Sequence, residues 1–305
     1  MNSLVDNVSQ SIDLLPGTYV VAVSGGVDSV ALLDLLVKAQ PKTNFVVAHY
    51  DHGIRPDSVY DRKLVQDLAK KQNLPFVYSE GKLGIGASET EARDARYSFL
   101  KQTQQASGAR AIITAHHQDD ALETAVININ RGTGRRGITS LGDHPHMQRP
   151  LLHISKAELI DYAKEQGLVW REDSTNKDTA ILRNYIRSKL DKVKNSKDYP
   201  KLVEAVKNMR RINRELDELI EVYLHSQDNR QLLDRQQFAQ LPHELSKEVL
   251  AQWLRNQGIT TFNSSLLEDL VIKCKTLSVG KTIDVDNINK IEINKDNLAL
   301  VSSER

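Results

Sequence analysis

Apolar and polar positions follow two different periods along the first half of the chain. Short runs rich in β-branched residues predict four strands, at residues 19–24, 44–50, 75–80 and 110–116. Apolar residues recurring every three to four positions predict a helix after each strand, at residues 28–39, 58–72, 88–106 and 118–130. Ser88 and Glu91 form a capping-box pattern at the start of the third helix. The alternation predicts the α/β class, a Rossmann-like parallel sheet with helices on both faces.

The second half has a different pattern, which predicts a smaller α+β domain. Residues 201–225 keep the helical period over a length typical of a connecting helix. It is followed by a short strand, by helices near residues 244–257 and 264–275, and by an alternating stretch typical of hairpins at residues 281–301. A chain of 305 residues has room for about two domains, and we place them at residues 1–200 and 201–305.

Composition narrows the cellular environment. The one cysteine, Cys274, excludes an intramolecular disulfide and an all-cysteine metal site, and it fits a reducing cytosol. No apolar run approaches the roughly 20 residues that span a bilayer, and the N-terminus lacks the basic and apolar regions of a signal peptide. We therefore expect a cytoplasmic protein without a membrane partner. The formal net charge is +1, so a nucleic acid would have to be held by local basic patches.

A tight turn, Ser-Gly-Gly-Val-Asp-Ser, joins the first predicted strand to the first predicted helix. Glycine permits a sharp turn and a close approach to a ligand, and a helix N-terminus offers free N–H groups to phosphate. Asp28 would repel a phosphate unless Mg²⁺ bridges the two, so the turn indicates a metal–triphosphate complex. A turn needed only for packing is the alternative. The predicted ATP-binding residues in this turn are Ser24, Gly25, Gly26, Val27, Asp28 and Ser29.

A second polar cluster, "HHQDDALET", follows the fourth predicted strand. His116 and Asp120 are four positions apart and Asp120 and Glu123 are three apart, so each pair shares a helix face. The two carboxylates could hold an ammonium group or Mg²⁺, and the histidine could accept a proton from an attacking amine. The alternatives are a transition-metal site and a helix start that is stabilised by acids near its positive end.

Two further motifs belong to the same edge of the predicted sheet. His49, Asp51 and His52 close the second strand, where main chain commonly meets adenine and ribose; hydrogen bonds within the loop are the alternative. Arg93 and Arg96 are three positions apart on the third helix and suit phosphate or the charge that develops in adenyl transfer. A solvated helix face is the alternative for this pair, of which we take Arg93 as the catalytic member.

Two basic segments are candidates for contact with RNA. The glycine-rich loop "RGTGRRG" could clamp RNA through Arg131, Arg135 and Arg136 while a target base is unstacked. Between residues 183 and 214, eleven basic residues accompany three acidic ones, a local net charge of +8. The alternative for the loop is that its arginines lie on the surface by chance, and the alternative for the second segment is that its charges serve only solubility. The RNA-binding residues predicted in the second segment are Arg183, Arg187, Lys207, Arg210 and Arg211.

These motifs together resemble a known family. "SGGVDS" resembles the PP-loop of the N-type ATP pyrophosphatases, which cleave ATP between the α- and β-phosphates. The order "AHYDHGIRPDS", "EARDARYSFL", "TAHHQDDALET", "NRGTGRRGITSLG", "RPLL" and "WREDSTNKD…RNYIR" is similar to that of the tRNA(Ile)-lysidine synthases. The resemblance is dense over about residues 18–190 and weak beyond them. Longer members have a second C-terminal domain, so we expect a short form or a truncated chain.

The resemblance implies a reaction, its cofactors and its partners. ATP, with Mg²⁺ held by Asp28 and Asp120, would adenylate O2 of the wobble cytidine in the CAU anticodon of tRNA(Ile). Free L-lysine would then displace AMP at C2 and give lysidine, which changes codon specificity from AUG to AUA. Asp28, His116, Asp120, Glu123 and Arg93 would be catalytic, and residues 201–305 would bind the tRNA. The sequence leaves the oligomeric state open, a homodimer included.

Other functions stay as alternatives with specific requirements. A tRNA thiolase with the same loop would use reactive cysteines near the site, but Cys274 belongs to the second predicted domain. Amidotransferase synthetases need a glutaminase or an ammonia channel, and no glutaminase motif is present. A non-catalytic module that binds tRNA or nucleotide would not need Asp28, Asp120 and Glu123 beside a phosphate loop.

Overall fold

The chain forms two compact units, Met1–Arg210 and Arg211–Arg305, which divide within helix α9 (Tyr199–His225). The computed structural model describes residues 3–12, 14–53, 58–81, 88–142, 146–171, 182–226 and 231–302. The sequence placed a boundary near residue 200, and the separate functions assigned to the two parts stay predictions.

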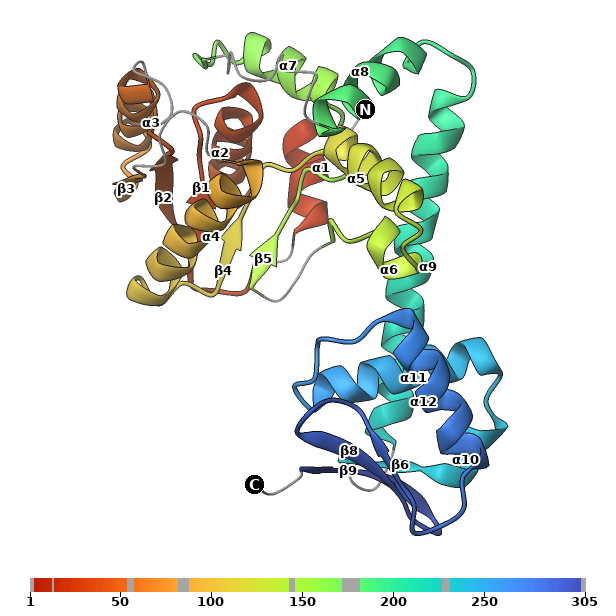
Figure 1. Ribbon diagram of the computed structural model, residues 1–305. Helices are drawn as coiled ribbons and strands as arrows, with labels where there is room; N and C mark the ends of the chain where they lie inside the picture. Colours follow the sequence, from red (N-terminus) through yellow and green to blue (C-terminus); the bar gives the residue numbers. More distant parts are fainter. Residues whose placement is uncertain are drawn as a thin grey trace. The chain divides into compact units, whose positions relative to one another are not determined.

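The first unit is built on a five-stranded parallel sheet with the order β3-β2-β1-β4-β5 (Figure 1). Its strands are β1 (Thr18–Ala22), β2 (Asn44–Asp51), β3 (Phe76–Glu80), β4 (Ala111–Ile113) and β5 (Met147–Gln148). The strand order reverses between β1 and β4, because β2 and β3 extend to one side of β1 and β4 and β5 to the other. In open α/β sheets, such a switch point is where the carboxyl ends of the strands leave room for a ligand.

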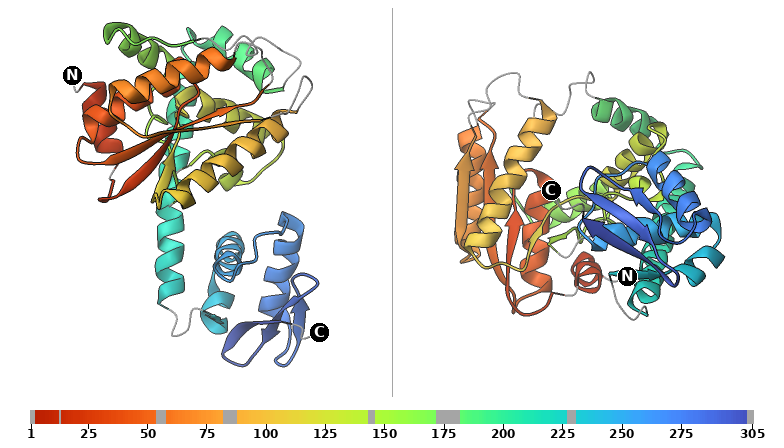
Figure 2. Two further views of the ribbon diagram at one scale, coloured as in Figure 1. Left: turned by 90° about the vertical axis from the view of Figure 1, so that its left-hand side faces the viewer. Right: turned by 60° about the horizontal axis from the view of Figure 1, so that its bottom comes forward.

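Helices cover both faces of this sheet, as both views in Figure 2 also show. The helices of the first unit are α1 (Leu4–Ser11), α2 (Val27–Ala39), α3 (Ser58–Lys71), α4 (Glu89–Ala106), α5 (Gln118–Asn130), α6 (Arg135–Ile138), α7 (Lys156–Glu165) and α8 (Leu182–Val193). Tyr19 and Val21 of β1 point into the core that contains α2 and α7, whereas Val20 points to Leu100 of α4. This alternation along one strand confirms the predicted Rossmann-like architecture.

A further apolar cluster joins α5, α8 and the first part of α9. Leu122 and Ala125 of α5 pack with Ile186 and Leu190 of α8 and with Val206 of α9. The carboxylates of α5 are therefore presented next to the basic side chains of α8.

The second unit is α+β, as predicted. Its elements after α9 are β6 (Leu232–Asp234), α10 (Arg235–Gln240), α11 (His243–Asn256), α12 (Ser264–Thr276), β7 (Thr282–Asp284), β8 (Asn289–Ile293) and β9 (Asn297–Ser302). The strands form an antiparallel sheet with the order β6-β9-β8-β7. Phe238, Leu250 and Trp253 are almost fully buried in its core.

Long periodic elements were predicted well and short ones were missed. Helix α5 spans the predicted residues 118–130. The predicted capping box is present at the start of α4, where Ser88 Oγ accepts from the Glu91 amide at 3.2 Å. Strand β5 has two residues, too few for a period to be recognised, and α7 and α8 were not predicted. Within the described parts of the chain, we find no helix of the length and apolar character that a membrane crossing requires.

We expect Leu250→Ala to destabilise the second unit by about 2–5 kcal/mol, because it leaves a cavity in a packed core. Leu250 is 0% exposed and lies among the core residues that surround Trp253. Urea unfolding of the full chain, followed by tryptophan fluorescence, measures the decrease in stability. Leu219→Ala is the matched control, because Leu219 on α9 is 67% exposed. Equal decreases in both variants would contradict the assigned core.

Candidate active site

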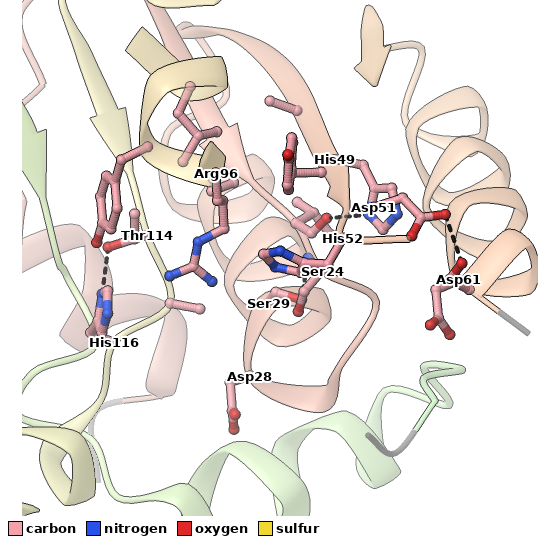
Figure 3. A pocket seen from close by; sticks show the side chains of 18 residues that line it. Ser24, Asp28, Ser29, His49, Asp51, His52, Asp61, Arg96, Thr114 and His116 are labelled. Carbon is pink, nitrogen blue, oxygen red and sulfur yellow. Dashed lines mark hydrogen bonds between the residues drawn. The ribbon is translucent and has the colours of Figure 1, made fainter. Parts of the chain in front are cut away.

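A cavity of about 360 Å³ lies at the carboxyl ends of β1, β2 and β4, at the switch point of the sheet. Its wall includes the glycine turn after β1, the end of β2, the segment after β4 and one side of α4. Figure 3 shows Arg96 and His116 on one side of Ser24 and Ser29, with Asp28 set apart from the side chains of β2. The described polar residues of the wall are Ser24, Asp28, Ser29, His49, Tyr50, Asp51, His52, Ser58, Asp61, Arg96, Tyr97, Thr114 and His116.

The turn after β1 has the geometry of an anion-binding loop. Gly25 has a φ of +96°, a conformation that disfavours any residue with a side chain. The amides of Ser24 and Gly25 both donate to Ser29 Oγ, at 3.1 and 3.2 Å, and Ser29 Oγ donates to the Gly26 carbonyl at 2.9 Å. Gly26 is the N-cap of α2 and provides no side-chain cap. The hydroxyl of Ser29 thus holds the turn together, and the positive end of α2 is left without a side-chain cap, as suits an anion site at a helix start.

The segment after α7 braces this turn from outside. The Arg171 amide donates to the Gly25 carbonyl at 3.0 Å, and Arg171 Nε lies 2.6 Å from Asp61 Oδ1 of α3. Gly25 is therefore held between α3 and the residues that follow α7.

Asp28 is surrounded by cationic groups from two other helices. Its Oδ2 lies 3.5 Å from Lys156 Nζ, at the start of α7, and 3.7 Å from His117 Nε2, at the start of α5. Burial raises the pKa of Asp28, but the hydrogen bond and charge of His117 and the charge of Lys156 outweigh it, so the pKa lies below its usual value. Asp28 Oδ1 is buried and has no hydrogen-bond partner among the described residues.

His117 is enclosed between two carboxylates. Its Nε2 lies 3.5 Å from Asp120 Oδ2, in addition to its contact with Asp28, and its amide donates to the same Asp120 oxygen at 3.0 Å. Burial lowers the pKa of His117, but Asp28, Asp120 and Asp119 more than offset burial and raise it above its ordinary value. The imidazolium form is therefore more stable here than in a free histidine, because its charge would compensate two acids.

The starts of three helices meet at this point. Gln118 of α5 donates its amide to the Ile154 carbonyl just before α7, at 2.9 Å, and the Lys156 amide approaches Asp119 Oδ1 at 3.5 Å. Asp28 belongs to the first turn of α2. Three positive helix ends therefore converge, which favours an anionic ligand here.

Glu123 is engaged inside the protein. It is 1% exposed, and its two oxygens accept from Arg183 Nε at 2.9 Å and from Arg187 Nε at 2.6 Å. The same arginines lie 3.9 Å from Asp120 Oδ1. Arg183 and Arg187, predicted to bind RNA, thus serve here to pair α8 with the acids of α5.

His116 differs from its neighbour His117. Its Nδ1 lies 2.8 Å from Thr114 Oγ1, and burial, together with Arg149, Arg96 and Arg93, lowers its pKa to about 3. A proton acceptor with so low a pKa is a weak general base near neutral pH.

Arg96, rather than Arg93, forms part of the cavity wall, and burial lowers the pKa of its guanidinium. Arg93 is exposed and stacks over the ring of Tyr97, with 4.8 Å between the guanidinium carbon and the ring centroid. The structure thus gives the two arginines different environments.

The residues at the end of β2 line the cavity and also make hydrogen bonds within the protein. His49 is 3% exposed, its Nδ1 lies 2.9 Å from the Val23 carbonyl, and burial lowers its pKa, so the ring is neutral. Asp51 accepts from the Gly53 amide at 2.8 Å and from Ser58 Oγ at 2.7 Å, which closes the loop before α3. His52 packs edge-on against Tyr50.

The other predicted RNA-binding residues lie away from the cavity wall. Arg131 is the exposed C-cap of α5, and Arg135 and Arg136 begin α6. Arg210 donates to the carbonyls of Leu141 and Leu152 and so supports the first unit. The exposed basic residues of α9 include Lys207 and Arg211, the latter 2.9 Å from Glu215 Oε1.

Sequence reasoning missed His117 and Lys156. A signal for Lys156 was available, because Ser155 and Glu158 form a capping box that marks the start of α7. His117 is the N-cap of α5, and its amide donates to Asp120, so His116 lies outside the helix and the spacing of four residues does not place His116 and Asp120 on one helix face. The motif residues 54–57 and 172–181 lie outside the described residues.

Comparison with protein families places the chain in a known group. The model of the PP-loop domain matches residues 4–194. A tRNA(Ile)-lysidine synthase of Thermus thermophilus is 42% identical over 175 residues, which are 55% of this chain but 34% of that protein. The matched part thus spans about a third of that relative, and 43% of the one from Thermotoga sp..

Other relatives match over most of their length. A tRNA(Ile)-lysidine synthase of Parasynechococcus marenigrum is 30% identical, and the match covers 92% of this chain and 87% of that protein. One of Bdellovibrio bacteriovorus is 34% identical, and the match covers 82% of this chain and 81% of that protein. Among solved structures, the U34-tRNA thiolase NcsA of Methanococcus maripaludis, with its 4Fe–4S cluster, superimposes with a TM-score of 0.58 at 15% identity. That match covers 68% of this chain and 77% of the thiolase, and at this identity it shows the fold alone. The chain belongs to the tRNA(Ile)-lysidine synthase family of PP-loop proteins.

Proposed function

We propose that the protein uses ATP to attach free L-lysine to C2 of the wobble cytidine in a CAU-anticodon tRNA, in the cytoplasm. Family membership supports this reaction class. The observation that carries the proposal is the meeting of the glycine turn, Asp28, His117 and Lys156 at the start of α2. A module that only binds tRNA has no need for a buried carboxylate and two cations at a phosphate loop.

In the first step, O2 of the cytidine attacks the α-phosphorus of ATP, and pyrophosphate leaves. The leaving group gains negative charge as the α–β bridge breaks. The start of α2, which has no side-chain cap, and the ammonium group of Lys156 are placed to stabilise that charge. Arg96 is suited to the α-phosphate, because it enters the cavity from α4.

Mg²⁺ fits the region of Asp28. The orphaned Oδ1 of Asp28 is a hard oxygen ligand, and Mg²⁺ in nucleotide sites usually takes one or two carboxylates and completes its shell with phosphates and water. Asp28 suits this task better than Asp120, because only Oδ2 of Asp28 faces cations, whereas both oxygens of Asp120 do. Bound there, the ion would neutralise phosphate charge.

In the second step, the lysine ε-amine attacks C2, the C2–O2 bond breaks, and AMP leaves with that oxygen. The amine must lose protons, and the weak basicity of His116 makes it a poor acceptor. Asp120 is the carboxylate suited to hold the lysine ammonium group, because both oxygens of Glu123 already pair with arginines. We assign Glu123 to orienting α8 against α5.

The fold likeness to a thiolase does not favour sulfur transfer. The first unit contains no cysteine, and Cys274, in the second unit, is fully buried. Incubation of a CAU-anticodon transcript with ATP and labelled lysine tests the proposal directly: label must enter the RNA, with release of pyrophosphate and AMP. ATP consumption without labelled RNA would contradict it.

We expect Asp28→Asn to lower lysine incorporation by roughly 100-fold, because the neutral amide cannot hold Mg²⁺ beside the phosphates. Calorimetry should show weaker binding of ATP-Mg²⁺, while the melting transition stays intact. Asp94→Asn, on the exposed side of α4, is the matched control and should behave as wild type. Normal turnover of Asp28→Asn would remove the metal role.

We expect Lys156→Met to slow adenylation by roughly 100-fold while ATP affinity changes much less, because its charge matters most as pyrophosphate develops. Single-turnover formation of pyrophosphate measures the step. Lys101→Met, exposed on α4, provides the same change away from the site. An effect confined to ATP binding would show that Lys156 does not act on the leaving group.

The basic part of α9 gives a prediction about tRNA. Lys207→Ala with Arg211→Ala should weaken tRNA binding and lower the slope of log K against log salt by about 0.7–0.9 for each phosphate that the variant no longer neutralises. Arg210 is left intact, because it holds the carbonyls of Leu141 and Leu152. Lys70→Ala with Lys71→Ala, exposed on α3, is the control pair. An unchanged slope in filter binding would assign the α9 charges to solubility.

A further inference from the structure

Helices α2 and α7 pack in parallel, and one register relates three of the polar contacts between them. The partners in each of these three pairs are separated by 128 positions in the sequence. The pairs are Asp28 with Lys156, Asp34 with Tyr162, and Lys38 with Gln166. Lys38 Nζ also donates to the Tyr162 hydroxyl at 3.2 Å, which is one helical turn from that register. Because the separation in the three pairs is constant over two to three turns, the helices run in the same direction without slipping relative to each other.

The middle of this interface is polar although it lies in the core. Asp34 Oδ2 accepts from the Tyr162 hydroxyl at 2.6 Å and from Lys38 Nζ at 2.7 Å. Lys38 also donates to Gln166 at 2.8 Å and lies 5.4 Å from the centroid of the Tyr162 ring. Asp34 and Tyr162 are 8% and 7% exposed. Burial raises the pKa of Tyr162, so its phenol stays protonated and remains a donor to Asp34.

Stability alone gives no reason for this network. Apolar side chains of similar volume often stabilise a buried interface as well as an ion pair does, because the charges lose hydration. Hydrogen bonds add direction, since each is satisfied in only one relative rotation and register of the two helices. A polar network between helices is therefore well suited to fixing a register.

The register matters at the other end of the same two helices. Asp28 and Lys156 are six positions from Asp34 and Tyr162, about 9 Å along each helix. A slip of α7 by one residue would turn Lys156 by about 100° and carry its ammonium group away from Asp28. The amide contacts of α7 with α5 hold its start, but they do not fix its rotation against α2.

We propose that Asp34, Tyr162 and Lys38 are positioning residues, which lock α7 onto α2 so that Lys156 faces Asp28 and the phosphate loop. They touch no reacting group and act through the helices. The proposal rests on the proposed function only for the task of Lys156, since the register is a property of the fold.

Tyr162→Phe tests the proposal, because it removes one hydroxyl and keeps the ring in the core. We expect kcat for lysine incorporation to fall about fivefold, the effect of removing one buried hydrogen bond. In a Lys156→Met background the same change should give no further fall, since the group it positions is absent. A double-mutant cycle in kcat, with melting temperatures for all four proteins, separates positioning from stability.

Tyr19→Phe is the matched control. Tyr19 is 2% exposed in the same apolar core and donates to the Leu15 carbonyl at 2.9 Å, but it takes no part in the contacts between α2 and α7. Its decrease in melting temperature should be similar to that of Tyr162→Phe, with kcat unchanged. A fall in kcat for both variants alike would show a general effect of destabilisation and would overturn the proposal.

Hydrogen–deuterium exchange supplies a readout that needs no activity. Amides of residues 156–165 should exchange faster in Tyr162→Phe than in wild type or Tyr19→Phe. Unchanged exchange there, or equal effects of Tyr162→Phe on kcat in both Lys156 backgrounds, would refute the positioning role. If wild type incorporates no lysine, the proposed function is wrong, and the exchange of α7 alone then decides for or against the register.

Discussion

The negative charge of Asp28 is the constraint around which the first unit is arranged. A carboxylate removed from water needs compensation by hydrogen bonds or charge. The sheet provides it through topology: β1 and β4 are neighbours, so the start of α2 lies beside the start of α5 and brings His117 into range. The packing of α7 on α2 adds Lys156. One acid is therefore served by two cations that are distant in sequence.

The acids of α5 pair with several of the basic residues between positions 183 and 214, so the charge of that segment is not all available to RNA. Arg183 and Arg187 neutralise Glu123, and Lys194 lies 2.7 Å from Asp119. Part of the local charge of +8 is thus neutralised within the protein. Charge that is free to meet phosphates resides on exposed lysines of α8 and α9 such as Lys189, Lys192 and Lys207. A count of basic residues overestimates an RNA-binding surface whenever acids lie on the helix packed against it.

The hydrophobic periodicity and local sequence motifs predicted the sheet, most helices and the phosphate turn. These features are determined by residues that are close together in the sequence. The capping box of Ser88 and the turn at Gly25 are local in this sense. The partners of Asp28 are not local. His117 reaches it because β1 and β4 are neighbours in the sheet, and Lys156 reaches it only through packing of α7 on α2. Strand β5 is too short to have a recognisable period.

The two adjacent histidines of the site have opposite pKa shifts, because one lies among arginines and the other among carboxylates. His116 lies near Arg96, Arg93 and Arg149, and burial with these charges lowers its pKa to about 3, whereas the carboxylates around the buried His117 raise its pKa above the ordinary value. A cation that Asp28 and Asp120 already neutralise adds little net attraction for a free anion, so attraction for phosphate must come from the end of α2 and from Lys156. Asp28 has two cationic neighbours, so its charge does not depend on Lys156 alone for compensation, whereas in a single ion pair it would.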